Sequence, residues 1–202
     1  MRPRVIPVLL LDSRKRLVKT RNFDDPTYVG DPFNVIRLFN EKEVDEIIVL
    51  DIEASMQGRK PDRGFLRELA SECFMPLGYG GGIALPEDAQ DLFSVGIEKV
   101  VIGRQSTDIK LIATLTKNFG AQAVAACMDC RRSGGCYSVF ADRASRKTAD
   151  DVVAHAKALE ASGVGEIILQ NAELDGARTG FDTDLIQRVS SSIDIPLVAL
   201  GG

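Results

Sequence analysis

The sequence predicts an α/β fold, a (β/α)8 TIM barrel built from two similar halves. Short continuous apolar runs alternate with helical patterns along the 202 residues, as expected for parallel strands covered by helices. An internal repeat is the second observation: residues 44–51 (VDEIIVLD) return as residues 164–171 (VGEIILQN). Residues 76–82 return as residues 196–202 with the same offset of 120, since both carry Pro-Leu followed by Gly-Gly. Two segments with one shared offset indicate a duplicated half-barrel.

The strands and helices expected along the chain follow from the spacing of its apolar residues. Strands are predicted where apolar runs are continuous, at residues 5–11, 46–51, 75–79, 99–102, 123–129, 166–171 and 196–200. Helices are predicted between them, at residues 32–42, 64–71, 86–95, 109–119, 148–162 and 182–189. Residues 19–31 and 131–147 interrupt the alternation. The second segment is predicted to be a hairpin, with a turn at residues 133–135 and a return strand at 137–140, and we expect no other antiparallel strand.

A complete barrel has eight strands, and this pattern supplies seven. The chain stops at Gly202, the repeat counterpart of Gly82, so a last strand and its helices are missing from the pattern. We therefore expect residues 1–202 to form a single barrel domain that is incomplete at its C-terminus. A fragment is the interpretation that this pattern favours, because an open barrel would expose two unpaired strand edges.

Composition limits the functional classes. A net charge of −4 argues against nucleic acid as the main partner. The apolar run at residues 5–11 is too short for a membrane span or a signal peptide, so a cytoplasmic protein without a membrane partner is expected. Cys127 and Cys130 have the spacing of a metal or redox motif, but on one strand they point to opposite faces. We expect reduced cysteines, no metal site and no cofactor.

Candidate catalytic groups come from the residues that follow the strands, where such barrels place their active sites. Asp129 ends the fifth predicted strand and is the best candidate for a general acid or base. A helix cap or an ion pair with Arg131 is the alternative. Asp51 occupies a similar place, with the neutral Asn171 as its repeat counterpart. The single histidine, His155, lies in an amphipathic stretch and is expected at the surface or partly buried in a helix, so proton transfer should fall to other groups.

Two glycine runs, related by the repeat, predict binding of a substrate with a phosphate at each end. Backbone N–H groups of successive glycines can approach a phosphate closely, although glycines also simply end strands. Asp175 and Gly176 are expected at the rim of the second run, and Lys19 could contact a phosphate or lie in solvent. The predicted phosphate-binding residues are Lys19, Asp51, Gly81, Gly82, Gly103, Arg104, Asp175, Gly176, Gly201 and Gly202.

Four charged residues of alternating sign lie at or near strand starts, at the end of the barrel opposite the active site. They are Arg4, Glu46, Lys99 and Glu166. Buried charges are costly unless paired, so a ring of these residues would be either a structural plug or a gate.

Together these residues resemble the cyclase subunit of imidazole glycerol phosphate synthase, over essentially the whole chain. The motifs that carry the resemblance are Asn22-Phe23, Gly30-Asp31-Pro32, Asp45-Glu46, Leu50-Asp51-Ile52, Gly80-Gly81-Gly82-Ile83, Asp175-Gly176 and Thr179-Gly180-Phe181-Asp182. The resemblance implies a glutaminase partner at the bottom of the barrel. It also implies a gate for ammonia formed by the four charged residues, and a substrate with two phosphates at the top.

The chain departs from that family at two places. The family uses two catalytic aspartates, and Asp129 matches the second, whereas Leu10 or Leu11 stands where the first is expected. Asp12 lies one or two positions away and is the candidate substitute. After the fourth strand, Gly103-Arg104 replaces a small polar pair that binds phosphate. Three interpretations stay open: a cyclase, a paralogue that supplies ammonia for amidino sugars of lipopolysaccharide or O-antigen, and an isomerase of the sibling barrel family.

Overall fold

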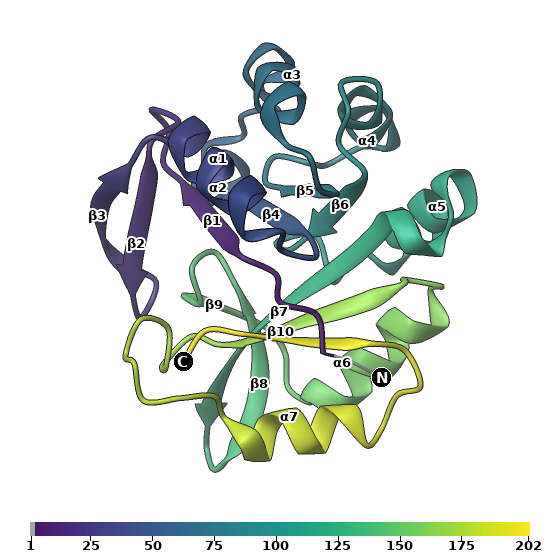
Figure 1. The fold of residues 1–202 in the computed structure, drawn as a ribbon. Coiled ribbons are helices and arrows are strands. Elements are labelled where there is room, and N and C mark those ends of the chain that lie inside the picture. Colours follow the sequence, from purple (N-terminus) through teal and green to yellow (C-terminus); the bar gives the residue numbers. More distant parts are fainter. Residues whose placement is uncertain (1–2) are drawn as a thin grey trace. The chain divides into compact units, whose positions relative to one another are not determined.

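The computed structural model describes residues 3–202, which divide into two compact units (Figure 1). Unit one holds residues 3–19 and 27–101, and unit two holds residues 20–26 and 102–202. Each unit has an α/β fold with parallel strands and is consistent with part of a (β/α)8 barrel. No helix within residues 3–202 is both long enough and apolar enough to cross a membrane.

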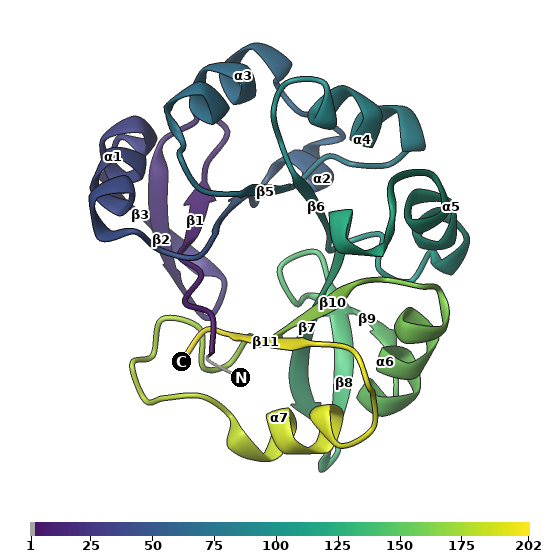
Figure 2. The same ribbon diagram turned by 45° about the vertical axis from the view of Figure 1, so that its right-hand side comes forward.

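Unit one is built on parallel strands in the order β6-β5-β4-β1. The strands are β1 (Val8–Leu11), β4 (Ile47–Asp51), β5 (Leu77–Gly80) and β6 (Lys99–Ile102). Its helices are α1 (Pro32–Lys42), α2 (Ala54–Gln57), α3 (Arg63–Glu72) and α4 (Pro86–Phe93). Helices α1, α3 and α4 lie side by side in both views (Figure 2). Ile47, Ile48 and Val49 of the central strand β4 are fully buried, which explains the continuous apolar run in the sequence.

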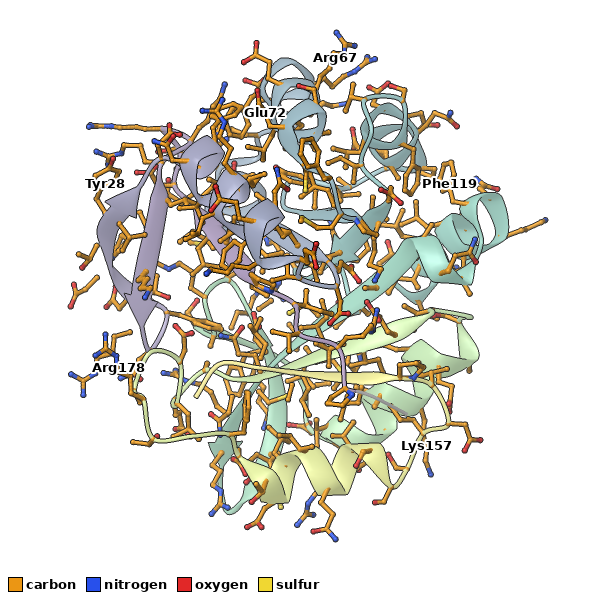
Figure 3. All side chains as sticks on the ribbon, viewed as in Figure 1. Tyr28, Arg67, Glu72, Phe119, Lys157 and Arg178 are labelled. Carbon is orange, nitrogen blue, oxygen red and sulfur yellow. The ribbon has the colours of Figure 1, made fainter. Side chains whose placement is uncertain are left out.

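The helices of unit one begin where the sequence provides a cap. The Asp31 carboxylate accepts hydrogen bonds from the backbone N–H groups of Phe33 and Asn34, and Pro32 occupies the first turn of α1. Asp62 caps α3 in the same way. In α3, Leu69 is buried, whereas Arg67 points outward (Figure 3). The predicted helix at 64–71 is therefore confirmed with small shifts at its ends.

An antiparallel strand in unit one contradicts the expectation that only the hairpin after Cys130 would be antiparallel. Strand β2 (Leu17–Arg21) pairs antiparallel with β1, with Leu10 opposite Val18 and Leu11 opposite Leu17. Strand β3 (Asp24–Gly30) follows it in the sheet order. The turn between β1 and β2 contains no glycine. Instead, Lys15 adopts a left-handed conformation and the Asp12 carboxylate accepts hydrogen bonds from the turn's backbone.

Unit two has strands in the order β11-β10-β7-β8-β9, of which β11, β10 and β7 run parallel. The strands are β7 (Val124–Ser133), β8 (Cys136–Ala141), β9 (Arg146–Ala149), β10 (Glu166–Asn171) and β11 (Leu197–Leu200). Its helices are α5 (Ile109–Phe119), the 3-10 turn η1 (Ala121–Ala123), α6 (Val152–Ala161) and α7 (Thr183–Ser190). Figures 1 and 2 both show α6 beside α7. The helix predicted at 109–119 is confirmed with the same bounds.

Strand β7 is longer than the predicted strand at 123–129, because it continues without a break into the hairpin. Asp129 pairs with Gln170 on the parallel side and with Phe140 on the antiparallel side. The turn at Gly134 and Gly135 is confirmed, with φ values of 61° and 85°, and β8 is the predicted return strand. A further strand, β9, takes up residues that were predicted to begin a helix. Helix α6 therefore starts only at Val152, where Asp151 caps it.

His155 lies on the buried face of α6 with 8% of its surface exposed, whereas Lys157 points outward (Figure 3). Its Nε2 atom makes no hydrogen bond within residues 3–202. Burial lowers the pKa of His155 below its ordinary value, because the charged form is poorly solvated there. The predicted place of His155 in a helix is confirmed, but the residue is buried rather than at the surface or partly buried, because it faces the apolar side of α6.

The wild-type protein should lose stability at acid pH because of His155, and the His155→Leu protein should not show this part of the loss. When the folded pKa is depressed, the unfolded chain takes up a proton first. Stability is therefore lost as pH falls below the unfolded value of about 6.5. Urea unfolding of both proteins at pH 5.5 and pH 7.5 tests this. The His155→Leu protein should keep the larger share of its pH 7.5 stability at pH 5.5. An equal loss in both proteins would show that folding does not lower the pKa of His155.

Candidate active site

Asp129 projects from β7 at the level where that strand pairs with the last residues of β10. It is half-buried, and Cys127, two residues earlier on the same face of the strand, donates a hydrogen bond from its thiol to Asp129 Oδ1 at 3.7 Å. Burial raises the pKa of Asp129 to about 7. The Cys127 contact works in the opposite direction, and the negative charge of Asp175 adds to the increase. A carboxyl group with a pKa near 7 can donate or accept a proton at neutral pH.

Cys127 and Cys130 are both buried and free, and they lie on opposite faces of β7 because the strand continues through them. Burial raises the pKa of both thiols, and the carboxylate of Asp129 adds to this. Neutral, buried thiols are poor nucleophiles and poor metal ligands. Within residues 3–202 no group of three or more His, Cys, Asp or Glu side chains is arranged to hold a metal ion.

Asp12, the candidate substitute for the missing first aspartate, is held by its own turn. Its carboxylate accepts hydrogen bonds from the backbone N–H groups of Arg14 and Arg16 at 3.0 and 2.9 Å. It also pairs with the Arg16 guanidinium at 2.8 Å. Burial acts to raise the pKa of Asp12, but the hydrogen bonds and charge of Arg16, with help from Arg14, lower it overall. Asp12 is therefore ionised at neutral pH and engaged with neighbouring groups.

Asp51 and the first glycine run form a compact corner in unit one. The Asp51 carboxylate pairs with the Arg59 guanidinium through two contacts of 3.1 Å, and it also accepts from the backbone N–H groups of Glu53 and Ala54. A Cβ atom on Gly81 would lie 2.6 Å from the Asp51 carbonyl oxygen. At Gly82 it would lie 2.3 Å from the Arg59 carbonyl oxygen. Glycine is thus required here for close packing. The backbone N–H of Gly82 already donates to Ser55 Oγ at 3.0 Å.

The second glycine run, Gly201 and Gly202, has φ values of 90° and 114°. A Cβ atom on Gly202 would lie 2.9 Å from the Gly180 backbone. Gly202 lines a shallow pocket in unit two with eight other residues. They are Leu169, Asn171, Leu174, Phe181, Asp182, Leu185, Ile186 and Leu200. Asp182 caps α7 at this pocket and accepts hydrogen bonds from Tyr137 and Asn171, a network that the sequence did not reveal.

Gly103 and Arg104 follow β6, and both lie in unit two together with the β8–β9 turn. Arg104 Nε is 2.5 Å from Asp142 Oδ1, and Arg146 Nε is 2.7 Å from Asp142 Oδ2. A Cβ atom on Gly103 would be 4.0 Å from Cys127 Cβ, which places this segment beside β7. The carboxylate of Asp142 offsets part of the positive charge that a phosphate would otherwise meet at Arg104.

Asp175 follows β10, is 8% exposed and is surrounded by hydrogen-bond donors from the protein itself. Its Oδ1 accepts from Gln170 Nε2 at 2.9 Å, and its Oδ2 accepts from Thr20 Oγ1 at 2.7 Å. A Cβ atom on Gly176 would lie 2.2 Å from the Thr20 carbonyl oxygen. Phosphate binding by these two residues stays a prediction; the contacts that the structure gives them are with Gln170 and the segment around Thr20. The partner segment, residues 20–26, could not be inferred from the sequence.

Three of the four predicted gate residues meet in unit one. Lys99 Nζ lies 2.6 Å from Glu46 Oε1, and Arg4 Nη1 lies 3.1 Å from Glu46 Oε2. The Glu46 and Lys99 side chains are 6% and 12% exposed, so this ion pair is largely withdrawn from water. Glu166, the fourth residue, is 5% exposed on β10 of unit two. Lys19 is exposed on β2.

The parallel strands and covering helices of both units define an α/β protein, consistent with part of a TIM barrel. The sequence model of one family, "Histidine biosynthesis protein", matches residues 4–202. The chain belongs to this histidine biosynthesis family.

Three relatives are named as subunits of imidazole glycerol phosphate synthase. A Pseudomonas aeruginosa protein named "Putative imidazole glycerol phosphate synthase subunit hisF2" is 47% identical over 204 residues, which cover 100% of this chain and 81% of that protein. Imidazole glycerol phosphate synthase subunit HisF of Pyrobaculum aerophilum is 35% identical over 201 residues, which cover 98% of this chain and 79% of that protein. HisF of Sulfolobus acidocaldarius is 34% identical over 200 residues, which cover 98% and 80%. The chain is therefore HisF-like, and the resemblance inferred from its motifs is confirmed.

Proposed function

We propose that this protein is the cyclase-type subunit of an imidazole glycerol phosphate synthase, which receives ammonia from a glutaminase partner and uses it on a substrate with two phosphates. The family membership and the names of the relatives support the reaction class. The observation that carries the proposal is Asp129, a half-buried carboxyl group whose pKa is raised to about 7 at the carboxyl end of a parallel strand. None of the relatives named above is named for sugar amidination, so the ammonia-supply alternative gains no support from them.

Asp129 would act as the general acid and base of the cyclisation. With its pKa near the working pH, the carboxylate accepts a proton from the attacking nitrogen. The resulting acid then returns a proton to the departing group. Cys127 supports this role by donating to Asp129 Oδ1, which orients the carboxyl group without supplying a competing charge.

The position of the missing second carboxyl group follows from strand register. Leu50 and Gln170 are counterparts at the sequence offset of 120. In unit one Leu50 pairs with Leu10, and in unit two Gln170 pairs with Asp129. Leu10 is thus the counterpart of Asp129, which supports Leu10 over Leu11 as the site of the absent aspartate. Asp12 supplies no replacement in this proposal, because Arg14 and Arg16 hold its carboxylate in the turn.

Cyclisation by the natural protein should accordingly be slow. Loss of one acid–base group typically reduces a rate by about 10²–10⁴, so turnover should lie well below the usual enzyme range of about 1–10³ s⁻¹. The Leu10→Asp protein should recover part of that loss, because it restores a carboxyl group opposite Leu50. Turnover is measured with the histidine-pathway substrate and an ammonium salt, on the protein as its gene encodes it.

Leu11→Asp is the matched control. Leu11 is 2% exposed and alternates with Leu10 along β1, so an aspartate there should destabilise the core without raising turnover. Wild-type turnover within the usual enzyme range would refute the need for a second carboxyl group. If folded wild-type and Leu10→Asp proteins both lacked turnover, while Asp129 still titrated near neutral pH, the cyclase function itself would be wrong.

A further inference from the structure

The tip of the β2–β3 segment, Thr20–Pro26, packs with unit two although the rest of both strands belongs to unit one. Three residues of this tip, Asn22, Phe23 and Asp25, have left-handed φ values of 52°, 63° and 47°. Residues other than glycine seldom adopt this conformation, so surrounding contacts must hold it in place. Those contacts come from two places in unit two: Asp175 after β10, and Arg143 in the β8–β9 turn.

Asp175 contacts the tip through both its backbone and its side chain. The Asn22 backbone N–H donates to the Asp175 carbonyl oxygen at 2.8 Å. The Thr20 hydroxyl and the Phe23 backbone N–H donate to Asp175 Oδ2 at 2.7 and 3.4 Å. Gly176 lets the two backbones approach, since a Cβ atom there would meet the Thr20 carbonyl oxygen at 2.2 Å. Asp175 thus satisfies donors that the left-handed turn leaves without partners inside the tip.

Arg143 holds the tip from the other side. Its Nε donates to the Phe23 carbonyl oxygen at 2.7 Å, and its Nη2 lies 3.8 Å from Asp24 Oδ1. The turn that presents Arg143 is itself unusual, because Asp142, Arg143 and Ala144 have φ values of 56°, 59° and 58°. Arg131 Nη1 donates to the Ala144 carbonyl oxygen at 3.1 Å and supports this turn. The Arg143 guanidinium therefore links the β8–β9 turn to the tip, and both segments contain residues with left-handed φ values.

We infer that Asp175 and Arg143 are positioning residues that fasten the tip Thr20–Pro26 and connect its docking to the carboxyl group of Asp129. The connection runs through Gln170. This side chain donates to Asp175 Oδ1, and its residue pairs directly with Asp129 in the sheet. Lys19 immediately precedes the tip in the chain, so fastening the tip also limits where that lysine can reach.

The charge of Asp175 acts on Asp129 across this connection. Asp129 has Gln170 beside it on β10 and Phe140 beside it on β8, and neither carries a charge. The groups of unit two that act on its ionisation are Cys127 on its own strand and Asp175 after β10. Removal of the Asp175 charge should therefore lower the pKa of Asp129, whereas removal of the hydrogen bonds should release the tip.

Two substitutions separate these effects. Asp175→Asn removes the charge but keeps an oxygen for Thr20 and Phe23, and the Gln170 amide can rotate to accept from the new NH₂ group. Asp175→Ala removes both the charge and the oxygen atoms that accept these hydrogen bonds. Hydrogen exchange at the Asn22 and Phe23 amides should become faster by about 10- to 100-fold in Asp175→Ala and stay within about threefold in Asp175→Asn. The Asp129 pKa, followed by carbon NMR of its carboxyl group, should fall in both.

Arg143→Ala should also speed exchange at the tip, by about tenfold, because it removes a hydrogen bond from a charged donor. Arg146→Ala is the matched control: Arg146 begins β9 directly after the same turn and contacts Asp142, so the tip should stay protected. Hydrogen exchange at the amides of the buried strand β10 should be equally slow in every variant, which shows that the variant is folded.

Equal exchange at the tip in wild type, Asp175→Ala and Arg143→Ala would overturn the fastening role. An unchanged Asp129 pKa in Asp175→Asn would overturn the connection. Both readouts are independent of turnover, so they distinguish this inference from the proposed cyclase reaction. If fastening holds but neither variant changes turnover, the tip does not serve that reaction.

Discussion

Asp129→Asn should make the protein more stable at pH 8 while removing most of its activity. Burial raises the pKa of Asp129 to about 7, against about 3.8 for an unperturbed aspartate. Holding the ionised carboxylate in the folded protein at pH 8 is therefore unfavourable. Three pKa units correspond to at most about 4 kcal/mol. Asparagine has nearly the shape of the protonated carboxyl group and carries no charge, so it avoids this cost.

The pH dependence has a definite sign. Because the folded pKa lies above the unfolded one, the unfolded chain ionises first, and the protein loses stability as pH rises from about 4 to about 7. The loss is complete about one pH unit above the folded pKa, and the curve is flat beyond that. The asparagine protein should lack this slope. Urea unfolding at intervals between pH 4 and pH 8, carried out in the His155→Leu background to remove the opposing titration, measures it directly.

Asp88→Asn is the matched control, since Asp88 is likewise withdrawn from water, even more than Asp129, but its pKa is shifted in the opposite direction. Burial acts to raise its pKa, but hydrogen bonds from Ala84, Lys60 and Leu85 lower it overall. Asp88→Asn should therefore destabilise the protein at pH 8. Activity with ammonium salt should fall by about 10²–10⁴ in Asp129→Asn. Activity that survives within a few-fold would end the catalytic role of Asp129, and an unchanged pH slope would show that its carboxyl group is better solvated than its surroundings suggest.

Much of the fold could be predicted because the spacing of neighbouring apolar residues distinguishes strands from helices. Fully buried parallel strands such as β4 and β10 appear in the sequence as continuous apolar runs, and the helices between them have amphipathic faces. Strand β2 was missed since its turn has no glycine and depends on hydrogen bonds from the Asp12 side chain. Strand β9 was missed because Arg146–Ala149 is short and mostly polar, and its last residues resemble the start of the helix that follows.

The candidate site was predictable only where a residue's surroundings follow from its place on a strand. Asp129 was found because it ends an apolar run, and its burial follows from that position. Asp51 and Asp175 also follow strands, but Arg59 and Thr20 give them different roles, and neither partner is visible in a local pattern. Glu46 and Lys99 could be grouped in advance, because both stand at or near strand starts; they are 53 residues apart in sequence, and their side-chain atoms are 2.6 Å apart in the structure.

Lys99→Ala should cost about 3–5 kcal/mol of stability, because it leaves the Glu46 carboxylate buried with less compensation. Glu46 is 6% exposed and has two contacts to Lys99 Nζ, at 2.6 and 2.9 Å, and one to Arg4 at 3.1 Å. Arg4 is 42% exposed and more strongly screened by water, so it cannot offset the loss. Urea unfolding at neutral pH measures the change. The double variant Glu46→Gln/Lys99→Met should recover most of the stability, since it removes both charges and retains the apolar stem.

The same pair of proteins tests whether the ion pair has a role beyond stability. If ammonia from the glutaminase partner passes this point, Lys99→Ala should reduce glutamine-driven turnover more than turnover driven by an ammonium salt, because ammonia from solution need not enter through the partner. The double variant separates the two roles. It should be stable, yet still transfer ammonia abnormally, since the charged gate is absent. Equal losses in both assays for Lys99→Ala, with both restored in the double variant, would show that Lys99 and Glu46 form a structural ion pair and nothing more.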